Sequence, residues 1–173
     1  MKVVVTKYNP EWPTLFSAEV HELSGVFGEE LLQIHHIGST SVPGLKAKPI
    51  IDIMPVVKNI QVVDDLRQEM IALGYEALGE YGIPGRRYFR KGAKHRTHHV
   101  HVFEVRSEHI ERHLAFRDYL RAHPDEAKRY GDLKAALAKQ YPDDIEAYMD
   151  GKNSYIQRVE GQALLWGPGS EIL

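Results

Sequence analysis

The sequence contains no cysteine among its 173 residues. This absence excludes disulfides, zinc–thiolate sites, iron–sulfur clusters and thiol catalysis. The sequence also lacks a run of about 18 apolar residues, which a membrane-spanning helix needs. Polar and proline residues follow the first few residues at once, where a signal peptide has an apolar stretch of about 7–15 residues. We therefore expect no membrane partner and a cytoplasmic location.

A large net charge is missing too, since 22 Lys and Arg stand against 24 Asp and Glu, for a formal charge of −2. Long-range attraction to nucleic acid or to anionic lipid cannot then be the main driving force for binding, so any anion site must be local. We do not expect nucleic acid as a partner. With 43% hydrophobic and 27% charged residues, the composition is typical of one globular domain over residues 1–173. It does not indicate the oligomeric state.

Apolar spacing and turn residues predict an α/β (α+β) chain, with a mixed sheet flanked by helices and a helical extension. The sheet-containing core is expected over about 1–106 and the helical extension over about 107–166, followed by a loose tail at 167–170. The strongest expected strand is an almost continuous apolar run that contains a single carboxylate, Asp52. The expected strands are 3–6, 31–37, 50–57, 75–78, 87–90 and 98–105. The expected helices are 13–27, 59–73, 108–123, 125–140 and 153–166.

A turn of small residues follows the second expected strand, and it consists of Gly38, Ser39, Thr40 and Ser41. Backbone N–H groups and hydroxyls in such a turn can converge on an anion, as they do in phosphate-binding turns. The next strand would place Asp52 beside that anion, where a carboxylate can hold a divalent cation that bridges to phosphate. A Ser/Thr-rich turn with no ligand and a hydrogen-bonded Asp are the alternative interpretation.

Residues 36–53, HIGSTSVPGLKAKPIIDI, resemble the signature of the GrpB family, a bacterial group within the nucleotidyltransferase superfamily. Four further segments are similar to that family: 8–12, 98–102, 116–124 and 148–152. The resemblance covers nearly the whole chain and implies a nucleotidyltransferase fold. It also implies that the Gly-Ser turn positions a triphosphate and that two acids, spaced Asp-x-Asp or Asp-x-Glu, hold two metal ions.

The second acid of that pattern is missing, because position 54 is Met54. Residues 52 and 54 share one face of a strand, and a thioether cannot replace a carboxylate as a ligand for Mg²⁺. We therefore expect weak or absent metal-dependent nucleotidyl transfer. If the geometry is otherwise retained, Met54→Asp is expected to create a second metal position.

Four of the ten histidines fall between residues 95 and 101. In a strand, His99 and His101 point to one face and His98 to the other, so a His-x-His pair can bind one metal ion. Asp52 would complete a set of two imidazoles and a carboxylate, which suits Zn²⁺, Fe²⁺ or Mn²⁺ better than Mg²⁺. Two alternatives stay open: the histidines line an anion pocket, or they pack without a ligand.

Basic residues outside the histidine cluster are candidates for phosphate binding. Arg117 and Arg121 lie four residues apart on one face of an expected helix, so both guanidinium groups can reach one anion. Solvated charge is the alternative interpretation for this pair. The other candidates are Lys48, Lys152 and Arg87, the last together with Arg86.

The leading hypothesis is a nucleotidyltransferase-superfamily protein that binds a nucleotide or another phosphorylated small molecule. It would use a divalent ion, Mg²⁺ or Mn²⁺ with Zn²⁺ as the alternative, and metal-dependent nucleotidyl transfer would be its reaction. In this hypothesis Asp52 is both the catalytic and the metal-binding carboxylate. The competing hypotheses are a non-catalytic nucleotide-binding module and a metal-dependent hydrolase that uses Asp52, His99 and His101. Fold alone does not decide between them.

Overall fold

The computed structural model describes residues 2–166, so the tail expected at 167–170 lies outside the described residues. The described chain divides into two compact units. The sheet unit contains residues 11–37 and 50–110, and the helical unit contains residues 2–10, 38–49 and 111–166. Residues 38–49 therefore belong to the helical unit, although they connect two strands of the sheet unit in the sequence.

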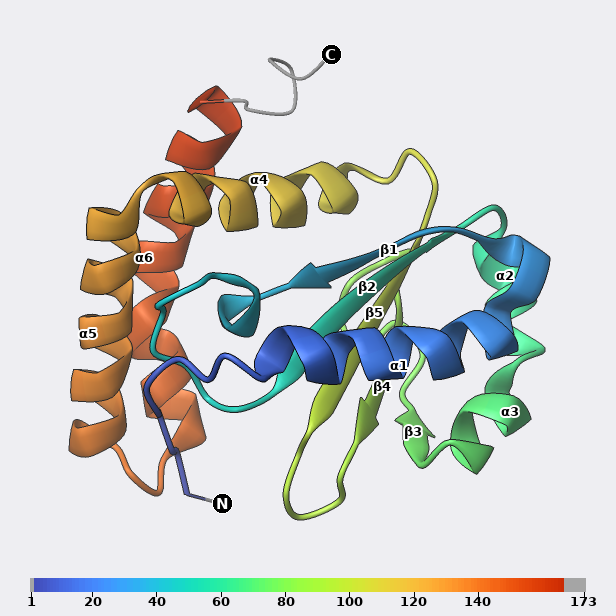
Figure 1. Cartoon of the computed structure of the whole chain (residues 1–173), viewed down its shortest axis with the longest axis horizontal. Coiled ribbons are helices and arrows are strands. Elements are labelled where there is room, and N and C mark those ends of the chain that lie inside the picture. The colour runs from blue at the N-terminus through green and yellow to red at the C-terminus, as the bar shows by residue number, and fades with distance from the viewer. Residues whose placement is uncertain (1, 167–173) are drawn as a thin grey trace. The chain divides into compact units, whose positions relative to one another are not determined.

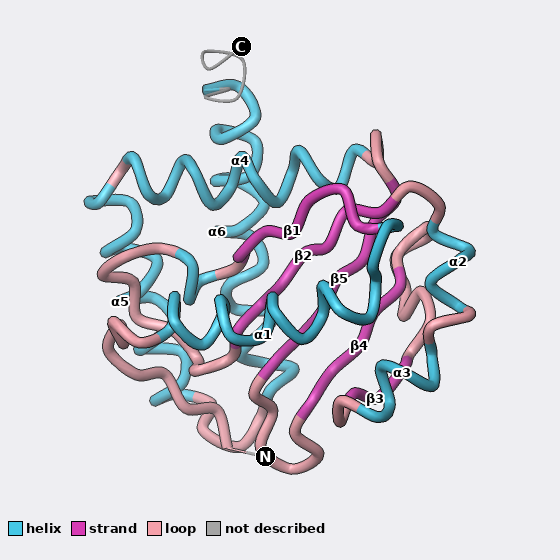
Figure 2. Tube along the Cα trace, turned by 45° about the vertical axis from the view of Figure 1, so that its right-hand side comes forward, coloured by secondary structure: helices cyan, strands magenta, loops and turns pink. Residues whose placement is uncertain are grey.

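The sheet unit is built on one five-stranded mixed sheet in the order β1-β2-β5-β4-β3 (Figures 1 and 2). Strands β2 and β5 pair in parallel, and every other neighbouring pair is antiparallel. Strand β2 lies inside the sheet, between β1 and β5, where its continuous apolar run can be covered on both faces. The strands are β1 (Leu31–Ile37), β2 (Ile51–Val57), β3 (Tyr75–Ala77), β4 (Arg87–Lys91) and β5 (His98–Glu104).

Helix α1 (Trp12–Phe27) lies across one face of this sheet (Figure 2). Its large apolar side chains Trp12, Leu23 and Phe27 are buried, with Leu23 fully inaccessible. A buried carboxylate, Glu19, accepts hydrogen bonds from the Tyr75 hydroxyl at 2.9 Å and from the Lys91 ammonium at 2.8 Å. Because a buried charge needs such partners, this cluster fixes the position of α1 on the sheet.

The helix expected over 59–73 is instead two short helices, α2 (Ile60–Asp64) and α3 (Arg67–Ala72). Asn59 caps α2 by accepting a hydrogen bond from the backbone N–H of Gln61. At the break, the N–H groups of residues 65 and 66 each bond to the carbonyl three residues earlier instead of four. This tighter 3₁₀ turn ends α2, and apolar spacing alone did not reveal it.

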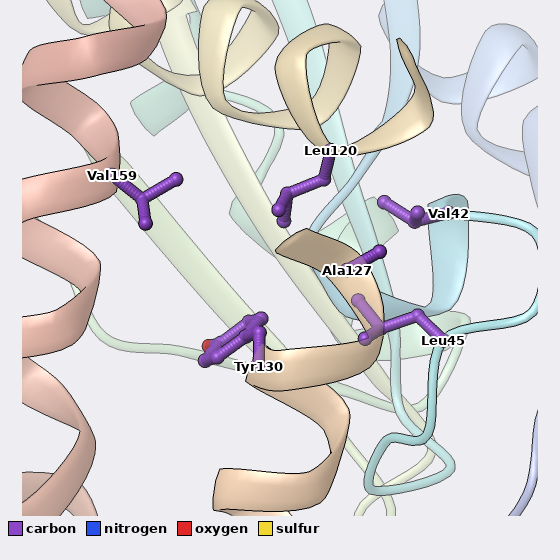
Figure 3. Close-up of a cluster of buried hydrophobic side chains, with 6 residues drawn as sticks. All are labelled: Val42, Leu45, Leu120, Ala127, Tyr130 and Val159. Atoms are coloured by element: carbon purple, nitrogen blue, oxygen red, sulfur yellow. The ribbon is translucent and has the colours of Figure 1, made fainter. Parts of the chain in front are cut away.

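The helical unit contains α5 (Pro124–Gln140), α6 (Ile145–Trp166) and most of α4 (Glu108–Ala122). Its main core joins these helices to the segment 38–49, which supplies two of the buried side chains (Figure 3). That segment is therefore held by apolar packing on helices that follow it much later in the chain. The core residues are Val42, Leu45, Leu120, Ala127, Tyr130 and Val159.

Two expected elements differ from the structure of this unit. The strand expected at 3–6 is reduced to a single bridge, in which Thr6 exchanges two backbone hydrogen bonds with Ala47. Helix α6 begins well before the expected residue 153, because Asp144 caps it through the N–H of Ala147. Among residues 2–166, no helix combines the length and the apolar character needed to cross a membrane.

Candidate functional site

Three polar side chains converge on one face of the sheet where β2 and β5 run in parallel. Asp52 lies opposite His99 in the register of these strands. The Asp52 Oδ1 atom is 3.1 Å from His101 Nε2 and 3.5 Å from His99 Nδ1. His98 points to the other face, where its Nε2 is 3.5 Å from Glu19 Oε2. This arrangement follows from strand alternation, as the sequence predicts.

The two imidazoles decide the ionisation of Asp52. Burial alone raises the pKa of this carboxyl, but the hydrogen bonds from His101 and His99 outweigh it and hold the pKa well below its ordinary value. A quarter of the Asp52 side chain and 23% of His99 remain accessible. The group is thus an ionised, partly accessible carboxylate with two imidazole neighbours.

Arg86 is only 7% exposed. It contacts the ring nitrogen of His101 that does not face Asp52. Its Nη1 atom lies 3.4 Å from His101 Nδ1. A guanidinium has only donors, so Nδ1 must be the acceptor, and the ring proton of a neutral His101 then lies on Nε2. In this state His101 donates to Asp52. Arg86, His101 and the Asp52 carboxylate then form a chain of hydrogen bonds.

Tyr88 packs against this group from the next strand, β4, where it is paired with His101. Its ring centroid is 5.3 Å from that of His101 and 5.7 Å from that of His99. The Arg86 guanidinium lies over the Tyr88 ring at 4.7 Å from its centroid. Burial, followed by the charge of Asp52, raises the pKa of Tyr88 to about 12, so its phenol stays protonated at neutral pH.

The spacing of Asp52, His99 and His101 suits a shared metal ion. One ligand atom from each of them lies within 4.8 Å of the other two. Ligands placed about 2.1 Å from one ion in tetrahedral geometry are about 3.4 Å apart. The separations of 3.1 and 3.5 Å from the Asp52 oxygen are close to that value.

Met54 lies on the same face of β2 as Asp52 and is fully buried. It is paired with His35 of β1 and has no oxygen to offer a metal ion. A second metal position of the two-acid kind is therefore not built at this point of the strand.

Arg87 points away from the Asp52 group. It lies on the opposite face of β4 from Tyr88, and its guanidinium makes two hydrogen bonds to Asp64 of α2, at 2.7 and 3.2 Å. The structure thus brings Arg86 to the histidines, whereas Arg87, the candidate for phosphate binding, is paired with Asp64. Because successive side chains point to opposite faces, the two adjacent arginines contact different groups.

The expected Gly-Ser turn forms a 3₁₀ turn at Ser39–Ser41 in the helical unit. Gly38 precedes it with a φ of 72°, a conformation that favours glycine. The Ser41 hydroxyl donates to the Gly38 carbonyl, and Arg121 Nε donates to the Ser41 carbonyl at 2.9 Å. Thr40 is also buried. The structure therefore brings Arg121 to the turn, as a group that fixes its backbone.

The other basic candidates of the helical unit lie in two places. Arg117 Nε is 2.8 Å from Asp118 Oδ1, and burial followed by the charge of Arg117 lowers the pKa of Arg121. Lys48 and Lys152 place their ammonium groups over the ring of Tyr148, at 5.4 and 5.3 Å from its centroid. These two lysines are distant in sequence but share one aromatic neighbour.

Sequence reasoning missed two members of the Asp52 group, Arg86 and Tyr88. Arg86 was weighed only as part of a pair of arginines, and the alternation that separates the two depends on where β4 begins. Tyr88 reaches the histidines through the cross-strand register of β4 and β5, which a single sequence does not specify.

Solved structures identify the class of fold. With a TM-score of 0.53 and 12% identity, the chain is similar to the Cid1 poly(U) polymerase bound to magnesium and 3′-dATP, over 78% of this chain and 42% of that one. This likeness shows the fold alone: a mixed sheet with flanking helices of the nucleotidyltransferase type.

The family follows from closer matches. The family model for the GrpB protein matches residues 2–162, and the chain belongs to the GrpB family. It is 48% identical to the GrpB protein of Enterococcus faecalis, with a TM-score of 0.91 over 93% of this chain and 97% of that one. It is 51% identical over 168 residues to the UPF0157 protein YqkA of Bacillus subtilis, which covers 97% of this chain. The chain spans about half the length of that relative, 49%.

Proposed function

We propose that this protein binds a nucleotide or another phosphorylated small molecule together with a divalent metal ion held by Asp52, His99 and His101. The observation that carries the proposal is the convergence of these three side chains, with ligand atoms within 4.8 Å of one another, on a sheet of the nucleotidyltransferase type.

The chemistry of the donor set decides which ion fits. Two imidazoles and one carboxylate suit Mn²⁺ or Zn²⁺, whereas Mg²⁺ prefers oxygen ligands alone. Met54 supplies no further oxygen. The residues thus fit Mn²⁺ or Zn²⁺ better than the Mg²⁺ of a standard two-acid site.

Arg86 sets a condition on that binding. A ligating His101 uses an unprotonated Nε2 and carries its proton on Nδ1, where metal-bound histidines usually donate to an oxygen. The Arg86 guanidinium occupies that position at 3.4 Å and can only donate. Ligation through Nε2 therefore requires Arg86 Nη1 to turn away from Nδ1, and this one nitrogen can then donate to a phosphate oxygen while Nε and Nη2 keep their bonds to the Glu80 and Tyr81 carbonyls.

A bound ion would polarise a phosphoryl oxygen and stabilise negative charge there. The chain's own residues have separate tasks. Asp52, His99 and His101 would hold the ion, and the Tyr88 ring covers one side of the two imidazoles. Within the helical unit taken by itself, we propose two separate phosphate-binding groups: the turn Gly38–Ser41 with Arg117 and Arg121, and Lys48 with Lys152.

A direct test titrates Mn²⁺ and Zn²⁺ into the protein by calorimetry, and then ATP in the presence of the ion. Asp52→Asn keeps the size of the side chain but removes its charge, so it should weaken Mn²⁺ binding about tenfold or more and weaken metal-dependent ATP binding with it. His95→Gln, in an exposed histidine outside the group, is the matched control and should change neither affinity. Unchanged Mn²⁺ affinity in Asp52→Asn would remove the metal role of this residue.

The products of a long incubation with ATP and Mn²⁺ separate the reaction classes. Release of pyrophosphate indicates nucleotidyl transfer, and release of inorganic phosphate indicates hydrolysis. Because Met54 replaces the second acid, we expect binding without either product.

A further inference from the structure

A glycine-rich loop connects β3 to β4 beside the Asp52 group, and it contains the strained residue Tyr81. The φ angle of Tyr81 is 48°, in the left-handed region that non-glycine residues seldom adopt. The neighbouring glycines at positions 79, 82 and 85 have φ angles of 61°, 92° and 84°. Strain of this kind persists only where the surroundings hold the residue in place.

Arg86 supplies that hold. Its Nε donates to the carbonyl of Glu80 at 3.2 Å, and its Nη2 donates to the carbonyl of Tyr81 at 2.9 Å. The Glu80 carboxylate in turn accepts from the N–H of Gly85 at 2.6 Å. The same arginine contacts His101, so one buried side chain fixes both the loop and the histidine.

The held conformation places the Tyr81 ring on the aromatic group of the site. It stacks on Tyr88 with ring centroids 5.2 Å apart and an angle of 21° between the ring planes. The Arg90 guanidinium is 5.8 Å from the Tyr81 centroid. Both neighbours belong to β4, and their positions, two residues apart, share the face that carries His99 and His101.

Tyr81 is nevertheless 56% exposed. Among the Phe, Tyr and Trp side chains of residues 2–166, it alone is exposed. A strained backbone, two carbonyls anchored by a buried arginine and a stacked neighbour thus present one aromatic ring to solvent.

We infer that Tyr81 is a stacking platform for a planar heteroaromatic group, the base of a nucleotide whose phosphates reach the Asp52 group. The inference rests on the proposed function and names the part of the ligand that Tyr81 recognises. Rings step outward from His101 to Tyr88 at 5.3 Å and from Tyr88 to Tyr81 at 5.2 Å. In a nucleotide, the sugar separates the base from the phosphates. In the protein, the Tyr88 ring separates Tyr81, which would bind the base, from the histidines near the phosphates.

Stacking on a tyrosine face tolerates different bases, because every base has a π-face. The anchored ring needs little ordering when the base arrives, which lowers the entropy cost of binding. Arg90 adds a positive charge beside the same ring and can strengthen the contact with a stacked base.

The test compares ATP with inorganic tripolyphosphate, each titrated by calorimetry in the presence of Mn²⁺. Tyr81→Asn removes the ring, and asparagine tolerates the left-handed backbone. We expect this variant to bind ATP about tenfold more weakly and to bind tripolyphosphate and Mn²⁺ as the unmodified protein does. Tyr81→Phe keeps the ring and should retain ATP affinity. Ile71→Ala, at a 43% exposed apolar position of the same unit, is the matched control.

In Tyr81→Asn, two results would overturn the inference: an unchanged ATP affinity, or an equal loss of affinity for ATP and tripolyphosphate. The first leaves the proposed function intact, because ATP still binds. If the unmodified protein binds Mn²⁺ and tripolyphosphate but gains nothing from the base of ATP, the platform fails alone. If it binds neither ATP nor tripolyphosphate, the proposed function fails with it.

Discussion

Two residues on one face of β2, Asp52 and Met54, have different surroundings. Asp52 keeps 25% of its side chain accessible and receives hydrogen bonds from two imidazoles, which compensate the loss of water around its charge. Met54 is 0% exposed. Position 54 is closed to solvent. A methionine therefore fits the packing there, although it departs from the two-acid pattern.

This burial changes the outcome expected for Met54→Asp. An aspartate at position 54 would be a buried charge without a partner, so we expect the substitution to lower the free energy of unfolding by about 3 kcal/mol or more. The volume-conserving Met54→Leu should cost less than about 1.5 kcal/mol. Urea denaturation followed by circular dichroism measures both. A folded and equally stable Met54→Asp variant that binds a second Mn²⁺ would contradict this view and restore the sequence-based expectation.

Sequence alone specified the orientation of the histidines but not their neighbours. Alternation fixes that His99 and His101 share a face, because it depends only on one strand. The contact with Tyr88 depends on the register between two strands, and Tyr81 depends on a loop whose backbone has a positive φ angle. Neither feature leaves a periodic pattern that a single sequence can reveal.

At the scale of elements, two glycines of α6 have different surroundings: Gly151 is tightly packed and Gly161 is not. A Cβ atom at Gly151 would lie 2.5 Å from Leu137 Cδ2 on α5, whereas a Cβ atom at Gly161 would meet nothing within 4 Å. Gly151 therefore allows two helices to approach closely, and this packing explains why α6 continues through it.

Alanine substitutions at the two positions should change the free energy of unfolding in opposite directions. Gly161→Ala should raise the free energy of unfolding by about 0.5–1 kcal/mol through the better helix propensity of alanine. Gly151→Ala gains the same propensity but overpacks the buried Leu137, at a cost of about 1–3 kcal/mol, so a net loss is expected. Guanidinium denaturation of the two variants gives the comparison. A gain of stability in both would show that Leu137 can move aside without cost.

Elements with strong signals were predicted well, and weak ones were not. The apolar run of β2 and the long helices α4 and α5 lie close to their predicted positions. The 3₁₀ break between α2 and α3 and the single bridge at Thr6 were missed, because each depends on a few hydrogen bonds and not on apolar spacing. The early start of α6 was missed because Gly151 weakens the helical pattern there.

At the scale of the whole molecule, the path of the chain links the folding of the two units. The helical unit consists of three separate segments, which are joined by residues of the sheet unit. When the sheet unit unfolds, those connections become long flexible loops, and the entropy of closing them opposes the helical unit. We therefore expect the two units to unfold in one transition.

The two tryptophans can test this expectation, because Trp12 belongs to the sheet unit and Trp166 to the helical unit. Trp12→Phe leaves a fluorescent reporter in the helical unit, and Trp166→Phe leaves one in the sheet unit. In each variant, the denaturation midpoint from fluorescence should coincide with the midpoint from far-ultraviolet circular dichroism. Separate midpoints would mean that the units unfold independently.

The position of residues 38–49 also limits how genes of this family can recombine. Leu45 and Lys46 lie against α5, where a Cβ atom at Gly131 would be 3.3 Å from each of them. A single crossover that joins the first half of one relative to the helices of another separates these residues from the helix they evolved with. A working chimera must inherit residues 38–49 and α5 from the same parent, so two exchanges that flank the intervening strands are needed in place of one.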